Sequence, residues 1–347
     1  MVGGRICVKY KDAGVNIDAA KTVVGIIAEK TKATLSHDVL KGVGPFGAMY
    51  RVPRDGMSDP VLVSTIDGVG TKLKICCAMG RHEEAGYDLV SHCANDVLAQ
   101  GALPLFILDY IAMSTLDSAV VGKIVDGMVR ACRECGCSLV GGETAELPET
   151  YPQDEYDLVG CMIGIVNAED IVDGKSIIPG DVVIGLPSTG LHTNGYSLAR
   201  KALLELRGFA LSDRLGELKT TVGDALLAPH RCYVPTVRPL LESRLIKGIA
   251  HITGGGLPGN VDRILPKGLG VEMERSSWEI PPIFGVIRRE GDVSEDEMYR
   301  TFNMGIGLVL VTARDDADRA MDGIAALGEE SRRVGEVVES GKAFTLK

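Results

Sequence analysis

The sequence of 347 residues predicts a mixed fold of the α/β or α+β class, divided into two domains. Short apolar runs rich in β-branched residues alternate with stretches of helical periodicity along the chain, as expected for such a fold. A glycine-punctuated apolar run, Gly160–Val166, ends a first block, and polar and turn residues follow before a new strand begins at Asp181. With 45% hydrophobic residues, the chain is long enough for two cores of ordinary size. We therefore expect domains at residues 1–168 and 169–347.

The charge and the apolar pattern exclude several classes of partner. A net charge of −10 with no basic run argues against a nucleic-acid backbone, whereas a phosphorylated small molecule needs only local positive potential. The segment Met1–Tyr10 lacks the apolar core of a signal peptide, and no run of about 20 apolar residues could span a bilayer. We therefore expect a cytosolic protein.

Nine cysteines are expected to act mainly as small buried hydrophobic residues. Cys132 and Cys135 could form half of a zinc site, but the sequence has no second pair to complete four ligands. We interpret this segment as the end of a helix, Ser118–Glu134, with Gly136 as its C-cap before a strand at Ser138–Val140.

A first cluster of polar residues follows a predicted strand that includes Val61–Val63. The next residues read S-T-I-D-G-V-G-T-K, in which the glycines let backbone N–H groups approach an anion. Lys72 supplies a positive charge for a phosphate, and Asp67 is a candidate metal ligand. A plain glycine turn is the alternative. The predicted phosphate loop comprises Asp67, Gly68, Val69, Gly70, Thr71 and Lys72.

A second and a third cluster carry further carboxylates. A predicted helix has a buried stripe formed by Leu89, Val90, Cys93, Val97 and Leu98. Its other face carries Asp88, His92 and Asp96 at spacings that a common ligand could bridge. A solvated polar face is the simpler interpretation of Asp88 and His92, whereas we interpret Asp96 as functional. Glu143 follows a strand and the pair Gly141 and Gly142, and acidic residues at strand ends are where hard cations bind in such sheets.

Two glycine-rich segments match G-x-G-x-x-G, but neither has the context of a nicotinamide-binding site. The first, Gly42–Gly47, contains Pro45, which restricts φ, and could close over a nucleotide through Gly44, Phe46 and Gly47. The second, Gly254–Gly259, precedes a helical pattern, and its N–H groups would face a phosphate. An ordinary helix N-cap is the alternative interpretation of Thr253 and the three glycines that follow it, Gly254, Gly255 and Gly256.

Two loop histidines are candidate functional groups. His192 follows the predicted strand Asp181–Leu186 and is interpreted as a proton carrier or as a hydrogen-bond donor to a bound phosphate, with a surface histidine as the alternative. His251 precedes the second glycine run and has the same interpretation. Asn194 is a natural N-cap for the helix that contains Leu198.

Eight motifs are spread over almost the whole chain: Y-K-D-A-G-V-N-I-D-A (Tyr10–Ala19), G-P-F-G-A-M (Gly44–Met49), S-T-I-D-G-V-G-T-K-L (Ser64–Leu73), N-D-V-L-A-Q-G-A-L-P-L-F-I-L-D-Y (Asn95–Tyr110), S-L-V-G-G-E-T-A-E-L-P (Ser138–Pro148), L-H-T-N-G-Y-S-L (Leu191–Leu198), A-H-I-T-G-G-G-L (Ala250–Leu257) and M-Y-R-T-F-N-M-G-I-G (Met298–Gly307). Together they resemble the phosphoribosylformylglycinamidine cyclo-ligase family, whose members are also called aminoimidazole ribonucleotide synthetases.

The resemblance implies a fold and an activity. The first domain would bind ATP and pair its sheet with that of a second subunit, giving a homodimer, and the second would pack helices on a mixed sheet. The enzyme would use ATP and Mg²⁺ to convert formylglycinamidine ribonucleotide into 5-aminoimidazole ribonucleotide, with release of ADP and phosphate, in de novo purine biosynthesis.

The resemblance also implies roles for the candidate residues. Lys72, His192 and Asn194 would be catalytic, and Asp67, Asp96 and Glu143 would bind the metal. ATP would contact Gly44, Phe46, Gly47, Asp67, Gly68, Val69, Gly70, Thr71, Lys72, Asp96, Gly141, Gly142 and Glu143. The substrate phosphate would contact His251, Thr253, Gly254, Gly255 and Gly256.

Two alternatives remain open from the sequence. The chain could be another ATP-dependent phosphoryl-transfer enzyme of the same superfamily, such as selenophosphate synthetase or thiamine-monophosphate kinase. The former would need a reactive cysteine in the glycine loop, and Gly42–Gly47 has none. It could also be an inactive nucleotide-binding subunit, but such a protein would be expected to have lost Asp67, Lys72 or Asp96.

Overall fold

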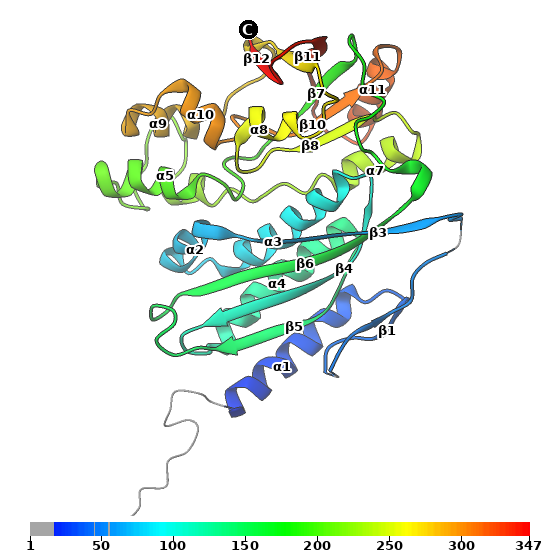
Figure 1. Cartoon of the computed structure of the whole chain (residues 1–347). Helices are drawn as coiled ribbons and strands as arrows, with labels where there is room; N and C mark the ends of the chain where they lie inside the picture. The colour runs from blue at the N-terminus through cyan, green and yellow to red at the C-terminus, as the bar shows by residue number, and fades with distance from the viewer. Residues whose placement is uncertain (1–16, 45, 55) are drawn as a thin grey trace, which may run out of the picture.

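Two β-sheets, one in each half of the chain, form the framework of the protein (Figure 1). This computed structural model describes residues 17–44, 46–54 and 56–347. Three features of the sequence lie outside the described residues: the segment Met1–Tyr10, the Tyr10–Asn16 part of the first motif, and Pro45.

The N-terminal sheet has four strands in the order β3-β6-β4-β5. Strand β6 is antiparallel to both β3 and β4, whereas β4 and β5 run parallel. The bounds are Pro60–Gly68 for β3, Leu103–Met113 for β4, Ser138–Glu146 for β5 and Tyr156–Asn167 for β6. A separate antiparallel pair is formed by β1 (Val39–Lys41) and β2 (Met49–Tyr50).

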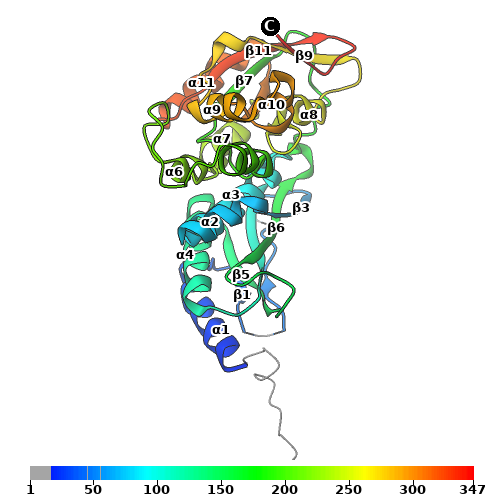
Figure 2. The same ribbon diagram turned by 90° about the vertical axis from the view of Figure 1, so that its left-hand side faces the viewer.

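Helices cover one face of this sheet, as Figures 1 and 2 show from two sides. They are α1 (Ile17–Thr31), α3 (His82–Leu98) and α4 (Ser118–Cys135), with the short α2 (Leu73–Met79) beside α3. The predicted apolar stripe of α3 is confirmed, because all five of its residues are fully buried. The predicted end of α4 is also confirmed, since Gly136 is its C-cap with φ +77°.

Helices α3 and α4 pack unusually closely because each has a glycine at the crossing. A Cβ at Gly86 would lie 1.9 Å from the carbonyl oxygen of Ile124, and a Cβ at Gly127 would lie 1.9 Å from that of Glu83. This crossing fixes α3 against the rest of the domain. Its other side lies under the C-terminal domain, so Asp88 and His92 are buried rather than on a solvated face.

The C-terminal sheet has six strands in the order β12-β9-β11-β7-β10-β8. Only the β12/β9 pair is parallel, which confirms the predicted mixed sheet. The bounds are Val182–Pro187 for β7, Gly248–His251 for β8, Leu269–Met273 for β9, Ile306–Thr312 for β10, Arg332–Glu339 for β11 and Phe344–Leu346 for β12. Strand β10 lies between β7 and the edge strand β8 and is buried along its whole length.

The helices of this half pack on the mixed sheet, as predicted. They are α5 (Tyr196–Arg200, continued by a π-helix at Lys201–Leu206), α6 (Val222–Leu226), α7 (Val234–Glu242), α8 (Gly256–Asp262), α9 (Pro282–Gly291), α10 (Glu295–Thr301) and α11 (Ala317–Ala326). Single 3₁₀ turns occur at Lys32–Thr34, Gly70–Lys72, Ala168–Asp170, Arg275–Ser277 and Arg314–Asp316. No helix among the described residues is long and apolar enough to cross a membrane.

Asp109 is a buried carboxyl group in the middle of the N-terminal sheet. It is 6% exposed, and its Oδ1 atom has no hydrogen-bond partner. The backbone of Gly142 on β5 lies against it, since a Cβ there would be 2.4 Å from Asp109 Oδ1. Burial raises the pKa of Asp109 to about 7.

This raised pKa predicts a pH-dependent stability. The folded protein holds the proton of Asp109 more tightly than the unfolded chain, whose Asp pKa is about 3.9. The stabilisation is therefore complete below pH ~4 and is lost as the pH rises through the folded-state pKa of about 7. Relative to Asp109→Asn, the wild-type free energy of unfolding should fall between pH 4 and 7. Urea denaturation at several pH values measures it.

The exposed Asp322 on α11 offers a matched control, because its side chain is not buried in the protein. The difference between wild type and Asp322→Asn should stay constant over the same pH range. A constant difference for Asp109→Asn as well would show that Asp109 titrates normally.

Candidate functional site

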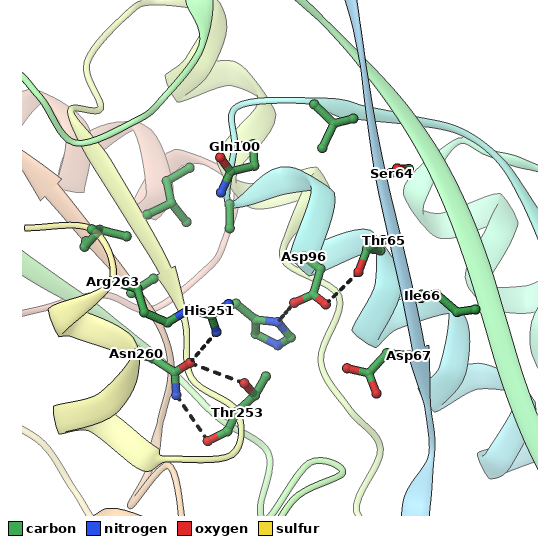
Figure 3. A pocket seen from close by; sticks show the side chains of 15 residues that line it. Ser64, Thr65, Ile66, Asp67, Asp96, Gln100, His251, Thr253, Asn260 and Arg263 are labelled. Carbon is green, nitrogen blue, oxygen red and sulfur yellow. Dashed lines mark hydrogen bonds and ion pairs between the residues drawn. The ribbon is translucent and has the colours of Figure 1, made fainter.

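A cavity of about 630 Å³ lies between the two domains (Figure 3). Strand β3 and helix α3 form its N-terminal wall, and β8, the following loop and α8 form its C-terminal wall. The lining residues are Val63, Ser64, Thr65, Ile66, Asp67, Ala99, Gln100, Asp96, Ile249, Ala250, His251, Thr253, Asn260, Arg263 and Ile264. Since both halves of the chain supply walls, the cavity exists only when the domains are docked.

Asp67 stands at the end of edge strand β3. The two-residue period of the strand places Thr65 and Asp67 on the side of α3, where they contact its polar residues. Asp67 Oδ2 lies 2.9 Å from His92 Nε2, and Asp67 Oδ1 accepts a hydrogen bond from the backbone N–H of Gly68 (2.6 Å). Burial alone would raise the pKa of Asp67, but His92 and Gly68 lower it below its usual value.

Asp96 projects from α3, one turn after His92, into the same cavity. Its Oδ1 accepts a hydrogen bond from His251 Nδ1 (2.8 Å), and its Oδ2 accepts one from the hydroxyl of Thr65 (3.2 Å). Burial opposes ionisation, yet the contact with His251 lowers the pKa of Asp96. Two ionised carboxylates, Asp67 and Asp96, therefore face one cavity, as predicted from the sequence.

Buried side chains connect these two carboxylates behind the cavity wall. His92 Nδ1 lies 2.7 Å from Thr193 Oγ1, which lies 3.2 Å from His230 Nδ1. His230 Nε2 lies 3.0 Å from His251 Nε2. We call this series the histidine chain; its members, in order, are Asp67, His92, Thr193, His230, His251 and Asp96.

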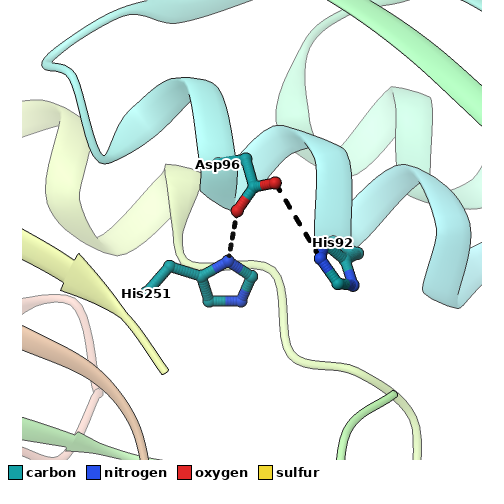
Figure 4. A group of neighbouring side chains, drawn as sticks. All are labelled: His92, Asp96 and His251. Atoms are coloured by element: carbon teal, nitrogen blue, oxygen red, sulfur yellow. Dashed lines mark hydrogen bonds and ion pairs between the residues drawn. The ribbon is translucent and has the colours of Figure 1, made fainter. Parts of the chain in front are cut away.

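Three members of the histidine chain could share a metal ion: His92, Asp96 and His251 (Figure 4). Their ligand atoms lie within 4.8 Å of one another, the one such group among the described residues. The ring nitrogens are already engaged, however, with Asp67, Thr193, His230 and Asp96. The carboxylates, which reach the cavity, are the better ligands for a hard cation.

The C-terminal wall carries Thr253, at the start of the second glycine segment, whereas Gly254, Gly255 and Gly256 do not line the cavity. Asn260 holds the loop in shape, because its amide nitrogen lies within hydrogen-bonding distance of the carbonyl oxygens of Thr253, Gly254 and Gly256. Arg263, one turn further on α8, lines the same part of the cavity and forms no ion pair with a described carboxylate. The wall opposite the two carboxylates thus offers a cation and polar groups.

Lys72 differs from its predicted position. It is completely buried, with Nζ 2.6 Å from Asp88 Oδ2 and donating to the carbonyl oxygen of Ala228 (2.7 Å). It does not line the cavity, since the chain turns away at Gly70 into a 3₁₀ turn and α2. Burial alone would lower the pKa of Lys72, but Asp88 raises it, so the amine stays charged. Lys72 therefore joins the domains rather than facing a phosphate.

Four other residues of the predicted phosphate loop do not line the cavity either: Gly68, Val69, Gly70 and Thr71. The hydroxyl oxygen of Thr71 lies 3.1 Å from that of Ser197 in the C-terminal half. The sequence alternative of a plain turn therefore accounts for their backbone here.

Glu143 is not brought together with Asp67 and Asp96 within one chain. It lies on β5, at the opposite edge of the sheet from β3. Glu143 pairs with Tyr110 of β4 across the sheet. The preceding residue, Gly142, pairs with Asp109, which lies in the same cross-strand row as Asp67. Because neighbouring residues of a strand point to opposite faces, Glu143 points away from the helices and Asp67 towards them. Gly141 and Gly142 lie beside it on β5.

His192 and Asn194 also differ from expectation. His192 is fully buried, its Nδ1 has no partner, and a Cβ at Gly307 would lie 2.4 Å from its ring. Burial holds the pKa of His192 well below its usual value. The N-cap of α5 is Gly195, not Asn194, whose amide instead approaches Thr193 Oγ1 (3.5 Å).

The first glycine loop is exposed at Gly44, Phe46 and Gly47 and does not line the cavity. Sequence reasoning also missed several residues of the site. His230 carries no motif, Thr193 stood between two candidates, and Arg263 follows the glycine run by one turn of helix. Only helical spacing after Asn260 could have indicated Arg263.

Sequence comparisons place both halves of the chain in known families. Residues 47–166 match the profile described as AIR synthase related protein, N-terminal domain, and residues 179–347 match the C-terminal domain of the same group. The phosphoribosylformylglycinamidine cyclo-ligase of Thermoanaerobacter pseudethanolicus is 48% identical over 331 residues, covering 95% of this chain and 98% of that protein. The enzyme of that name from Sorangium cellulosum is 49% identical, covering 96% of each.

Solved structures share the fold at low sequence identity. Thiamine-monophosphate kinase from Stenotrophomonas maltophilia has a TM-score of 0.70 at 18% identity, covering 94% of this chain and 96% of its own. The E. coli hydrogenase maturation protein HypE has a TM-score of 0.66 at 18% identity, covering 94% and 93%. A HypE structure in complex with ATP has a TM-score of 0.66 at 16% identity, covering 96% and 92%.

The buried position of Lys72 makes a prediction about stability. Lys72→Met should lower the free energy of unfolding by about 3–5 kcal/mol, because it leaves the Asp88 charge buried and unpaired. Adding Asp88→Asn should restore part of the loss. Lys74→Met is the matched control: its partner Glu155 is partly exposed, and a loss of at most about 1 kcal/mol is expected. Wild-type stability with a raised KM for ATP would instead indicate a phosphate contact.

Proposed function

The chain belongs to the phosphoribosylformylglycinamidine cyclo-ligase family, and on this basis we propose that it catalyses an ATP-dependent ring closure in de novo purine biosynthesis. Formylglycinamidine ribonucleotide is converted into 5-aminoimidazole ribonucleotide, and ADP and phosphate are released. The observation that carries this proposal is the identity of 48% with a cyclo-ligase over nearly the full length of both chains. The alternatives are not favoured, since thiamine-monophosphate kinase is similar only at 18% identity.

The chemistry of the reaction explains the need for ATP. A formamide oxygen is a poor leaving group, so ATP converts it into a phosphate ester. The amidine nitrogen that bears the ribosyl group then attacks the formyl carbon, and phosphate leaves. Most of the rate enhancement in such a step comes from positioning the reactants and stabilising charge on the phosphoryl group.

The carboxylates Asp67 and Asp96 suit a magnesium ion bound to ATP. Mg²⁺ usually takes one or two carboxylates, with phosphate oxygens and water as its other ligands. Both side chains are ionised, partly exposed and lie on the same cavity. The bound ion would neutralise charge on the transferred phosphoryl group. Glu143 is left out of this set because of its place on the sheet.

The opposite wall suits the ribose 5′-phosphate. Thr253 lines this end of the cavity, and Arg263 adds a positive charge beside it. The formylglycinamidine group would then lie towards Asp67 and Asp96. His251, with its Nδ1–H on Asp96, faces the carboxylates rather than this phosphate.

We also place the reaction in the cytosol. The eight described cysteines are all free, which suits a reducing compartment.

A labelled substrate tests the proposed reaction. Substrate with heavy oxygen in the formyl group, incubated with the protein, ATP and Mg²⁺, should yield the aromatic amine and inorganic phosphate that carries the label. Chelation of Mg²⁺ should stop the reaction. Label found only in water would rule out the phosphate ester, and absence of the amine product would rule out the activity.

The face of the N-terminal sheet that lies away from the helices supports a homodimer. No described helix packs on this face, and two large apolar side chains stand exposed on it: Leu62, at 55%, and Ile66, at 70%. The apolar runs Val61–Val63 on β3 and Leu105–Leu108 on β4 lie in this sheet. A second copy of the chain would bury these side chains across a two-fold axis.

The dimer predicts the effect of a charge on this face. Wild-type protein should sediment at about twice 36.9 kDa, and Leu62→Glu should shift it towards the monomer. Leu327, which is 50% exposed in the C-terminal half, offers the control Leu327→Glu, for which no shift is expected. A wild-type monomer with full activity, independent of concentration, would refute the dimer.

A further inference from the structure

The histidine chain runs through both domains. Asp67, His92 and Asp96 belong to the N-terminal half, and Thr193, His230 and His251 to the C-terminal half. Two of its contacts therefore cross between the domains: His92 Nδ1 with Thr193 Oγ1 (2.7 Å) and His251 Nδ1 with Asp96 Oδ1 (2.8 Å). Thr193 and His230 are 8% and 0% exposed and line none of the cavity. They reach a ligand only through their neighbours.

The hydrogen bonds of the histidine chain run in one direction when Asp96 is ionised and the buried rings of His251 and His230 are neutral. A carboxylate only accepts, so His251 Nδ1 carries the proton and donates to Asp96. A neutral His251 has no second ring proton, so its Nε2 accepts from His230 Nε2. A neutral His230 then has no proton on Nδ1, which accepts from the hydroxyl of Thr193.

The contacts at the other end of the histidine chain, from Thr193 to Asp67, are consistent with this direction. The Thr193 oxygen, having given its one proton to His230, accepts from His92 Nδ1 and from the amide of Asn194. His92 then presents Nε2 to Asp67 at 2.9 Å. Each carboxylate thus faces a nitrogen whose orientation is set from behind.

We propose that Thr193 and His230 are positioning residues of the active site, which fix the ring orientation and tautomer of His92 and His251 and thereby hold Asp67 and Asp96 in place for the reacting phosphates. The proposal rests on the proposed function for its effect on rate, but its account of the tautomers is independent of it. Without the Thr193 hydroxyl, His230 Nδ1 loses its donor and can take the proton itself. His230 would then have no proton to donate to His251.

The same geometry explains why the two residues act through the domain interface. A shift of the C-terminal domain relative to α3 changes the distances from His92 to Thr193 and from His251 to Asp96 together. The histidine chain therefore closes only when the domains are docked as they are here.

Matched substitutions at Thr193 test the proposal. Thr193→Val keeps the shape and removes the hydroxyl, whereas Thr193→Ser keeps the hydroxyl. We expect kcat to fall about 10- to 100-fold in Thr193→Val, as is typical of residues that orient a metal ligand. The KM for formylglycinamidine ribonucleotide should change little, because Thr253 and Arg263, which would face the substrate phosphate, are not members of the histidine chain. Thr193→Ser should stay close to wild type.

Changes at His230 give a second pair. His230→Gln keeps a donor near the position of Nε2 and should retain more kcat than His230→Phe, which keeps only the ring. Arg81→Met is the control for a general weakening of the domain interface. It removes a contact between the domains that does not involve the histidine chain, the hydrogen bond from Arg81 Nη1 to Asp224 Oδ1 (2.8 Å). Its kcat should match wild type.

Nitrogen-15 NMR of histidine-labelled wild-type protein provides a readout that needs no activity. His251 should be protonated on Nδ1 and His230 on Nε2, and His230 should change tautomer in Thr193→Val. The proposal is wrong if wild-type His251 is protonated on Nε2, or if Thr193→Val and Thr193→Ser lose the same kcat. If His251 and His230 have the expected tautomers but the protein makes no aromatic amine, the proposed function is wrong and the assignment of the tautomers stands.

Discussion

A buried ion pair between Lys72 and Asp88 anchors the arrangement of the two domains. Lys72 also donates to the carbonyl oxygen of Ala228, and Asp88 accepts from the backbone N–H of His230. Asn95, two turns further along α3, bonds both Arg231 and Tyr233 through their backbone. These contacts hold residues 228–233 of the C-terminal half against α3. A charge buried in this way is costly unless it is paired and hydrogen-bonded, so the docking is specific.

The cavity follows from this docking. Helix α3 carries His92 and Asp96, residues 228–233 carry His230, and β8 carries His251, so the docked surfaces bring three histidines and two carboxylates together. Within this group the carboxylates remain ionised because histidine donors offset their burial. The negative end of the cavity is thus preorganised opposite a positive wall formed around Arg263. A substrate with a phosphate at one end and a nucleotide with a metal at the other fit this polarity.

Sequence reasoning identified the strands and helices that depend on local pattern. The stripe of α3 and the Gly136 cap of α4 follow from periodicity and glycine conformation, whereas the mixed C-terminal sheet was implied by the family resemblance. The resemblance also grouped Asp67 and Asp96 in one metal set, and both line the same cavity. Helix α3 shows the limit: its polar face was read as solvated in part, although a second domain covers it.

The sequence by itself determined the family, the residue types available for catalysis and most of the local structure, because these depend on neighbouring residues and on motifs. Only the tertiary structure decided which of these groups share a site. Lys72 became a buried clamp because the chain turns at Gly70, and Glu143 lies apart because strand order and pleat put it on another edge and face. His230 and Thr193 joined the site because residues distant in the chain meet at the domain interface. Such contacts depend on how whole sheets and helices pack, which no short stretch of sequence encodes.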